Sequence, residues 1–357
     1  MKKTILLGIF ALAFAFSSVV KAEMSMSGYA EFFAGSADQP TANGVTNHGI
    51  DKSGMDNGTY TRLTANYSST MDNGIEVNGT MNATTRDCQG NSDDNCGVVN
   101  WNFMTFSGSF GAISVGERFA AGHAMMSRIT ASGPSSEPDG GNLKAFYTAS
   151  GANHGRTNEV DYANNSVKIL YSSNVYSGFS FAASLDPNTS NNGRAATRNG
   201  QQASGATAAA KWGSFNDLLS VFGKYAMEMD GVGLELVYGQ QTGNAGRGAT
   251  TDYNDLDETA YSAKVTYGNF AMDYRKNDQG DSGRPKNDGS GNDEGTSICA
   301  QYMMANIGLG ACSIESQFTT SSNTNNTHKM TTISAEYQLG GGVSLAATYF
   351  DVEQVQN

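Results

Sequence analysis

The chain of 357 residues is acidic, with 22 Lys and Arg against 34 Asp and Glu and a formal net charge of −12. This balance argues against a nucleic-acid partner, which requires a basic surface. The 43 Gly and low aliphatic content could indicate disorder, but 16 Tyr and 17 Phe argue against it, since disordered chains are poor in aromatic residues. A membrane barrel explains this composition, because it turns apolar side chains toward lipid and polar ones toward a wet lumen.

The first 22 residues have the features of a secretory signal peptide, which we exclude from the fold. Lys2 and Lys3 form a basic start, an apolar run covers 5–20, and Val20-Lys21-Ala22 resembles a cleavage site. The alternative is a membrane anchor, but about 16 apolar residues are few for a spanning helix. Cleavage removes three lysines, so the mature chain 23–357 has 19 basic residues and a net charge of −15. Because no later run is long enough for a spanning helix, a membrane location implies a barrel.

Segments of about ten residues that alternate apolar and polar side chains follow along the mature chain. In 60–67, for example, Leu63 and Tyr67 take one face and Arg62 takes the other. A soluble sandwich alternates too, but charge at mid-strand on the polar face, repeated along the chain, favours a transmembrane barrel. The predicted strands are 24–35, 58–69, 74–84, 98–107, 111–118, 159–173, 178–186, 218–229, 232–242, 258–267, 270–276, 295–304, 307–319, 328–339 and 343–353.

The predicted connections alternate between short turns and long polar loops, as in an up-and-down barrel with turns on one side of a membrane. Five tyrosines precede short turns on the outward face, as expected for an interfacial girdle: Tyr67, Tyr171, Tyr267, Tyr302 and Tyr337. An odd strand count is unusual for a bacterial single-chain barrel. We therefore expect an all-β, antiparallel transmembrane barrel of 16 strands, whose last strand is missing from this sequence. The alternative is that one strand was merged or wrongly assigned.

The sequence carries no HExxH, GxSxG or GxxxxGK motif, so it points to a channel and away from an enzyme. We expect no cofactor, and the four histidines show no zinc-ligand spacing. The Asp-rich stretch 278–294 could hold calcium. However, Asp288-Gly289-Ser290-Gly291 does not follow the ligand order of an EF-hand, and such a loop is more often merely solvated.

The four cysteines fit an oxidising compartment. Cys88 and Cys96 bracket a short stretch of one loop, which predicts a local disulfide. Cys299 and Cys312 are equidistant from the turn at 305–306, so they should face each other across a hairpin. Directly opposed cysteines on neighbouring strands come close enough to bond in a non-hydrogen-bonded pair.

Three stretches resemble the general diffusion porins of Gram-negative bacteria. The stretch 165–179, NSVKILYSSNVYSGF, is similar to their sixth and seventh strands. The stretch 110–118, FGAISVGER, is similar to the strand that leads into their third loop, and 27–31, SGYAE, resembles their first strand. The family closes on a strand that ends in Phe, whereas this sequence ends in Val355-Gln356-Asn357.

This resemblance implies a homotrimer of 16-stranded barrels in the outer membrane, with the third loop, about 119–158, folded inward to constrict each pore. A connection of about 40 residues is also too long for a simple hairpin loop and usually has a function. Loop acids would then oppose wall bases and set up a transverse field. The candidate constriction residues are Arg62, Arg118, Arg128, Glu117, Glu137 and Asp139. The alternative is that these charges only solvate a loop and a wall.

Further lumen charges are expected at Glu76, Lys168, Lys224 and Lys264, where they are balanced by nearby opposite charges. The predicted loops are rich in Asp and Glu, which would enrich cations at the mouth, more so at low salt. The sequence therefore predicts a porin that passes small hydrophilic solutes and ions with weak cation selectivity. A substrate-selective channel and a secreted, β-rich adhesin are the alternatives.

Overall fold

The computed structural model describes residues 23–37, 54–84, 98–126, 129, 166–189, 215–245, 252–286, 289–319 and 325–356. The predicted signal peptide, 1–22, lies outside these ranges and stays a prediction. Among the described residues, no helix has the length and apolar character needed to cross a membrane.

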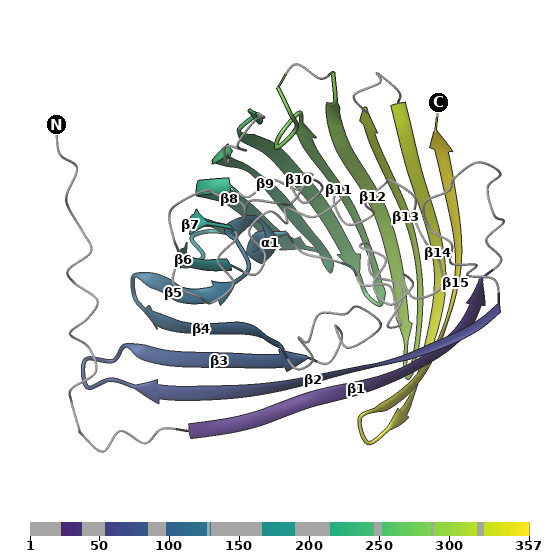
Figure 1. Ribbon diagram of the computed structural model, residues 1–357. Helices are drawn as coiled ribbons and strands as arrows, with labels where there is room; N and C mark the ends of the chain where they lie inside the picture. The colour runs from purple at the N-terminus through teal and green to yellow at the C-terminus, as the bar shows by residue number, and fades with distance from the viewer. Residues whose placement is uncertain are drawn as a thin grey trace.

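Fifteen β-strands form a single antiparallel sheet in which sequence neighbours pair in order. Viewed along its axis, the sheet curves into a ring around a central space (Figure 1). This confirms the predicted up-and-down, all-β architecture, and a strand is found at each of the fifteen predicted positions. The strands are β1 (Glu23–Ala37), β2 (Gly54–Thr70), β3 (Glu76–Thr84), β4 (Val98–Gly108), β5 (Gly111–Arg118), β6 (Ser166–Ser172), β7 (Phe179–Asn188), β8 (Phe215–Met229), β9 (Val232–Ala245), β10 (Leu256–Tyr267), β11 (Phe270–Gly280), β12 (Gly291–Met304), β13 (Ile307–Thr319), β14 (Asn325–Gly340) and β15 (Val343–Gln356).

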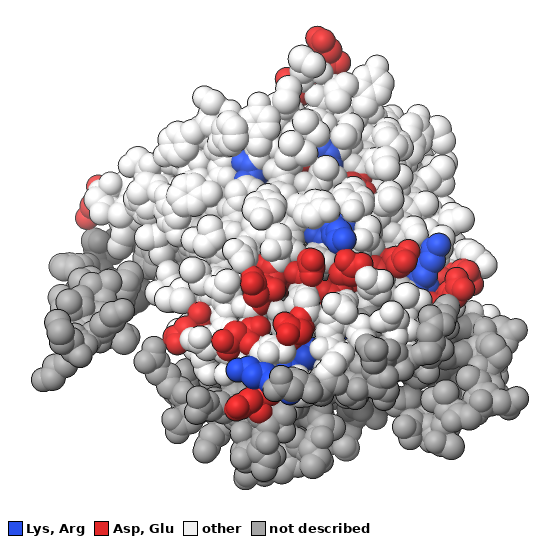
Figure 2. Space-filling model, turned by 90° about the horizontal axis from the view of Figure 1, so that it is seen from above, with Lys and Arg blue, Asp and Glu red and all other residues white. Residues whose placement is uncertain are grey.

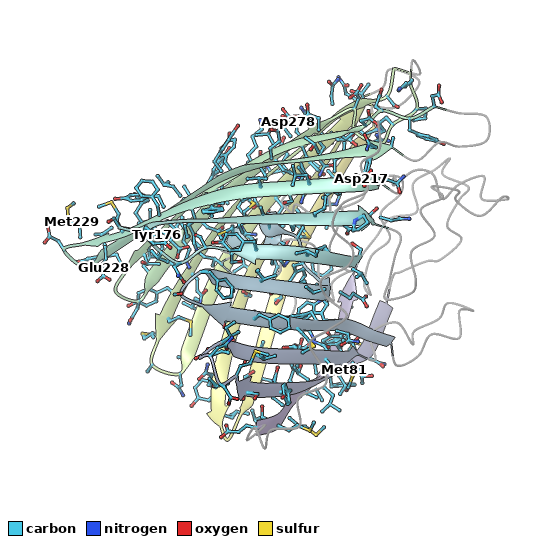
Figure 3. All side chains as sticks on the ribbon, turned by 90° about the vertical axis from the view of Figure 1, so that its left-hand side faces the viewer. Met81, Tyr176, Asp217, Glu228, Met229 and Asp278 are labelled. Atoms are coloured by element: carbon cyan, nitrogen blue, oxygen red, sulfur yellow. A yellow bond between two sulfur atoms is a disulfide. The ribbon has the colours of Figure 1, made fainter. Side chains whose placement is uncertain are left out.

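Short turns join the strands at one end of the sheet, and the longer connections lie at the other. Asp217 and Asp278 mark the loop end in Figure 3, and Glu228 and Met229 mark the turn end. The turn between β8 and β9 shows how the sequence sets such a connection. Asp230 and Gly231 both have positive φ, +52° and +79°, as a two-residue hairpin turn of type I′ requires.

Several strands extend farther toward the loop end than the apolar pattern predicted. β11 continues from the predicted end at 276 to Gly280, and β12 starts at Gly291 instead of 295. The added residues are polar on both faces, so apolar alternation cannot mark them. Their backbones still pair, with Asp278 opposite Glu294. The strands therefore continue beyond the apolar belt of the sheet.

The sheet has two free edges, β1 and β15. No ladder in the described part of the chain joins these strands, although both pair with their sequence neighbours. A sixteenth strand would lie between these edges, and it remains a prediction.

The two faces of the sheet differ in chemistry, as strand alternation requires. One row of register partners on the outer face runs through Val232, Tyr267, Phe270, Tyr302 and Leu309, near the turns. All five are exposed on that face. Such an apolar and aromatic row matches the girdle of a membrane barrel at a lipid interface. The inner face is polar and charged, and it forms the wall of the central space.

The helix α1 (Ala121–Met125) lies inside the ring, directly after β5 (Figure 1). Ala121 and Met125 form a buried apolar cluster with wall residues that include Leu170, Phe222 and Ala260. The main apolar core of the sheet is therefore on its inner face, between this segment and the wall.

Candidate functional site

The segment after β5 turns into the ring and is held there by hydroxyl groups of the wall. The backbone N–H of Ala121 donates to Oγ of Ser184 in β7, at 3.0 Å. The N–H of Gly122 donates to Oγ of Ser220 in β8, at 3.2 Å. The first N–H groups of a helix have no partner within the helix. These two serines therefore satisfy donors that would otherwise be buried without a partner.

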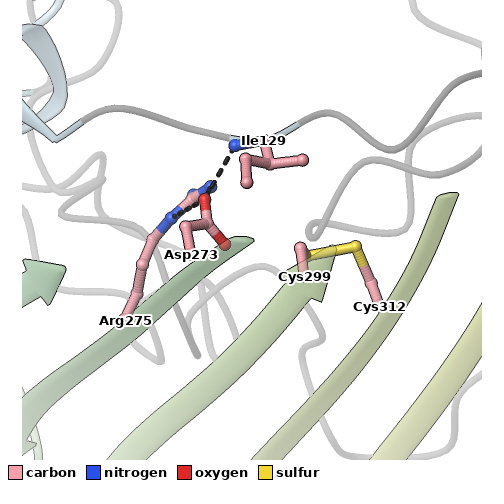
Figure 4. Close-up of a disulfide and its surroundings, with 5 residues drawn as sticks. All are labelled: Ile129, Asp273, Arg275, Cys299 and Cys312. Atoms are coloured by element: carbon pink, nitrogen blue, oxygen red, sulfur yellow. Dashed lines mark hydrogen bonds and ion pairs between the residues drawn. A yellow bond between two sulfur atoms is a disulfide. The ribbon is translucent and has the colours of Figure 1, made fainter. Parts of the chain in front are cut away.

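A second anchor lies farther along the same connection, at Ile129. Its backbone N–H donates to Oδ2 of Asp273 in β11 (2.7 Å), and the guanidinium of Arg275 donates to the same oxygen. The Ile129 side chain packs in a buried cluster with Cys299 and Cys312 of the neighbouring strands (Figure 4). The connection after β5 thus crosses the inner wall from β6 to β13. This supports the predicted inward fold of the loop for its described part, Phe119 to Met126 and Ile129.

The two basic candidates of the wall, Arg62 and Arg118, both face the inside of the ring. Arg62 in β2 lies opposite Tyr29 in β1, and its guanidinium carbon is 5.1 Å from the centre of the Trp101 ring. Arg118 lies over Phe103, at 4.5 Å, and donates to Oγ of a serine in its own strand. The other constriction candidates, Arg128, Glu137 and Asp139, lie outside the described residues.

The register of β5 bears on the prediction for Glu117. Its Cα partners are Asn102 in β4 and Val167 in β6, and the pairing has no register shift. In a regular strand adjacent residues face opposite sides, which would put Glu117 on the outer face while Arg118 faces inward. Glu117 is only 7% exposed, however, and the preceding Gly116 has a φ of +132°, outside regular strand geometry. A place for Glu117 in the constriction therefore stays a prediction.

The predicted lumen charges lie on the inner face, but they do not all meet water. Lys168 is only 1% exposed; its ammonium donates to the carbonyls of Arg118 and Ser166 and lies 3.8 Å from the carboxylate of Asp186. Lys168 therefore connects the end of β5 to β6 by hydrogen bonds and does not face the solutes in the lumen.

Three other charges are more open. Lys224 and Lys264 flank the carboxylate of Glu235 at 3.8 and 3.5 Å, and each is partly exposed. Glu76 is exposed on β3. Charges of the inner wall are therefore largely paired locally, as the sequence predicted.

The structure joins Cys299 and Cys312 by a disulfide between directly paired positions of β12 and β13. Both face the inside of the ring under Ile129, at 0% and 3% exposure. Cys88 and Cys96 lie outside the described residues. Where the chain is described, no group of three or more His, Cys, Asp or Glu is placed to hold a metal ion.

Acidic residues also gather on the outer face at the loop end. Outward-facing Asp257, Asp278, Glu294 and Glu315 come from four consecutive strands, β10 to β13. Figure 2, which looks onto this side of the molecule, shows a row of acidic side chains bordered by basic ones. Lys276 pairs with Glu294 at 3.0 Å. This row lies beyond the apolar belt, at the mouth of the ring.

A polar inner wall, an apolar outer belt and a segment folded into the central space together define a membrane channel of the β-barrel class. A family profile described as "Gram-negative porin" matches residues 8–357. The chain belongs to this family. It is an outer-membrane porin, which is a channel protein.

The solved structures that resemble the chain have the same fold at low sequence identity. The trimer form of OmpT from Vibrio cholerae is 11% identical with a TM-score of 0.61, and the match covers 95% of this chain and 90% of that one. OmpF of Salmonella typhi, in complex with daunomycin, is 12% identical with a TM-score of 0.55 and 93% and 98% coverage. A mutant porin of Rhodopseudomonas blastica is 15% identical with a TM-score of 0.52 and 94% and 98% coverage. No curated protein sequence matches the chain.

The sequence did not reveal the residues that hold the loop. Ser184 and Ser220 resemble any other hydroxyl residue on a wet face. For Asp273, nothing in the sequence indicated its bond to Ile129. The one available signal was the small and apolar stretch directly after Phe119, which is unusual for a solvated loop and predicts burial.

Proposed function

We propose that this porin forms a water-filled channel for passive diffusion of small hydrophilic solutes and ions, that it works as a homotrimer, and that it weakly favours cations. The observation that carries the proposal is the loop segment fastened to the inner wall at Ala121, Gly122 and Ile129. A segment held in this place narrows the lumen. Its side chains alone do not fill the lumen. We propose no catalytic role and no resident cofactor.

Local charge pairing of the wall supports the selectivity part of the proposal. Lys224 and Lys264 share the carboxylate of Glu235, and Arg275 pairs with Asp273. Paired charges give only a short-range field, so the excess negative charge of the chain, −12, controls the approach of small ions. This surface field is screened within about 10 Å at 0.1 M salt. Selectivity should therefore be weak and should grow as salt is diluted.

The trimer proposal follows from the neighbours and the family. The OmpT structure from Vibrio cholerae is described as a trimer, and this chain resembles it along nearly its whole length. Homo-oligomers of soluble and membrane proteins alike usually have closed symmetry. Three identical barrels inserted together would add three equal conductance units, which can then close one at a time.

Single-channel recording in planar bilayers under a salt gradient tests these statements. We expect conductance steps in groups of three, with a reversal potential of cationic sign that increases at low salt. An anionic sign would refute the selectivity proposal. Single, unrelated steps would refute the trimer. A protein that stays soluble without detergent and never conducts would instead favour a secreted, β-rich adhesin.

A substrate-selective channel is the second candidate. The aromatic and arginine side chains around Arg62 and Trp101 favour it, because charge alone does not require aromatic rings on a wet wall. Saturable binding of a solute inside the channel would distinguish it from a general pore.

A further inference from the structure

A continuous aromatic surface with arginines crosses the inner face of the sheet from β1 to α1. Tyr29 and Tyr60 lie 5.5 Å apart between ring centres, and the guanidinium of Arg62 lies over both rings, at 5.5 and 5.6 Å. The same guanidinium lies over Trp101. Trp101 meets Phe119 edge to face at 4.5 Å. Arg118 directly precedes Phe119 in the chain and lies over Phe103. We name the set Tyr29, Tyr60, Arg62, Trp101 and Phe119, with the adjacent Arg118, the aromatic–arginine wall.

This wall is open to the central space. Tyr29 is 44% exposed, and Arg62, Trp101 and Phe119 are half-buried. Tyr29 and Arg62 are register partners, so both lie at one level of the wall. Phe119 follows β5 directly, where the chain turns into the ring. A solute that passes the docked loop segment therefore meets these side chains.

The two arginines differ from the other basic residues of the wall. Lys168, Lys224 and Arg275 each have a carboxylate within ion-pair distance. The ion pairs found among the described residues include neither Arg62 nor Arg118. Both guanidinium groups are instead placed against aromatic rings.

The arginines also keep hydrogen-bonding capacity. A guanidinium carries five N–H donors in a planar fork. Arg62 donates through Nε to the hydroxyl of Tyr60, at 3.0 Å. Arg118 donates through Nη1 to Ser114, while its Nε is buried without a hydrogen-bond acceptor. The buried Nε of Arg118 is out of reach of a solute, so the fork of Arg62 is the better placed of the two for a further acceptor. A carboxylate fits the fork of a guanidinium with two parallel hydrogen bonds.

We propose that the aromatic–arginine wall is a binding site for planar anions, with aromatic carboxylates as the chemical class. The carboxylate would accept hydrogen bonds from Arg62 or Arg118, and the ring of the solute would stack on Trp101 or Tyr29. The inference rests on the proposed channel function and deepens it by giving the channel a solute preference.

A local site for anions is compatible with weak cation selectivity. The field of the whole chain acts on small ions at long range and is screened by salt. Stacking and bidentate hydrogen bonds act only at contact, inside the channel. Small inorganic cations and planar organic anions should therefore be favoured by different parts of the same protein.

The first test is current block by three matched solutes in planar bilayers. Benzoate carries a ring and a charge, cyclohexanecarboxylate only the charge, and benzamide only the ring. We expect benzoate to block the current saturably, with a half-blocking concentration about tenfold lower than for the other two. Equal block by benzoate and cyclohexanecarboxylate would show that charge alone acts and would overturn the proposal.

Variants place the block on this wall. Trp101→Leu and Arg62→Lys should each raise the half-blocking concentration of benzoate about tenfold, since one removes the ring and the other the planar fork. Lys329→Gln removes a positive charge from the outer face of β14, away from this wall, and should leave the block unchanged. Block that is unaffected by both wall variants would locate the binding elsewhere and overturn the proposal.

A fluorescence titration does not depend on conduction. The sequence has two tryptophans, so Trp212→Phe leaves Trp101 as the reporter. We expect 4-nitrobenzoate to quench the folded protein saturably, and 4-nitrobenzamide to quench it only in proportion to concentration. A protein that shows saturable quenching but never conducts refutes the channel proposal and keeps the site. A protein that conducts but shows neither saturable block nor saturable quenching refutes the site.

Discussion

Asp273→Ala should release the docked loop without unfolding the sheet. The carboxylate accepts the backbone N–H of Ile129 at 2.7 Å and also pairs with Arg275. A hydrogen bond to a charged group contributes about 1.5–3 kcal/mol, and 1.4 kcal/mol is a factor of ten in an equilibrium constant. The undocked population of the loop should therefore rise about 10- to 150-fold in the variant.

The change should be visible as excursions between conductance levels. Dwell-time analysis of single channels measures how often the loop leaves the wall, and we expect excursions in Asp273→Ala to increase by at least about tenfold. Asp273→Asn keeps the shape and an oxygen acceptor for Ile129, so it should lie between wild type and Asp273→Ala. Glu336→Ala is the matched control, because it removes a carboxylate from the inner face of β14 near the turn to β15.

The same excursion frequency in Asp273→Ala and Glu336→Ala would refute this reasoning. It would show that the bond from Ile129 to Asp273 does not affect how often the loop leaves the wall. A heat-dependent shift in gel mobility, measured for each variant, establishes that the barrel has folded before the currents are compared.

Three further perturbations test the packing of the inner wall. Gly239→Ala would bring a Cβ to 2.3 Å from the ring of Phe222, so it should destabilise the protein by about 1–3 kcal/mol in urea titrations, whereas Gly223→Ala, with no atom within 4 Å, should be close to neutral. Ser184→Ala and Ser220→Ala should each cost about 1 kcal/mol in the same titrations; because the two serines are register partners that hold consecutive N–H groups, the cost of the double variant should differ from the sum of the two. Replacing both disulfide cysteines by alanine should lower the free energy of unfolding by about 2–4 kcal/mol; an unchanged urea midpoint would show that the hairpin alone fixes this region.

The strands could be predicted from the sequence because the two faces of each strand meet different solvents. Apolar and polar residues alternate in segments such as Leu63 to Tyr67 because lipid lies on one side and water on the other. This alternation predicts both that the segment is a strand and to which face each side chain points. The same logic failed at the loop ends of β11 and β12. Both faces are polar there, so the strands continue without a pattern to mark them.

The candidate site was predicted only in part. The alternation of side chains along each strand placed Arg62, Arg118 and Lys264 on the inner face. Cys299 and Cys312 were paired because they are equally far in sequence from the turn between their strands. The same alternation does not settle the position of Glu117, because the preceding Gly116 has a positive φ.

The side on which Trp101 lies could not be predicted from the alternation of residues. β4 carries aromatic side chains on both faces, with Trp101 and Phe103 inward and Phe106 outward. A pairing irregularity between β3 and β4 lies just beside Trp101. Alternation therefore could not assign a side to these rings, and the aromatic–arginine wall depends on contacts between strands that are far apart in the sequence.

The position of the disulfide constrains the order of maturation. Cys299 and Cys312 pack in a buried cluster with Ile129, at 0% and 3% exposure. An enzyme that oxidises thiols needs direct access to the sulfur atoms. We therefore expect the bond to form before Ile129 packs against the two cysteines, and to resist reductants once Ile129 is in place.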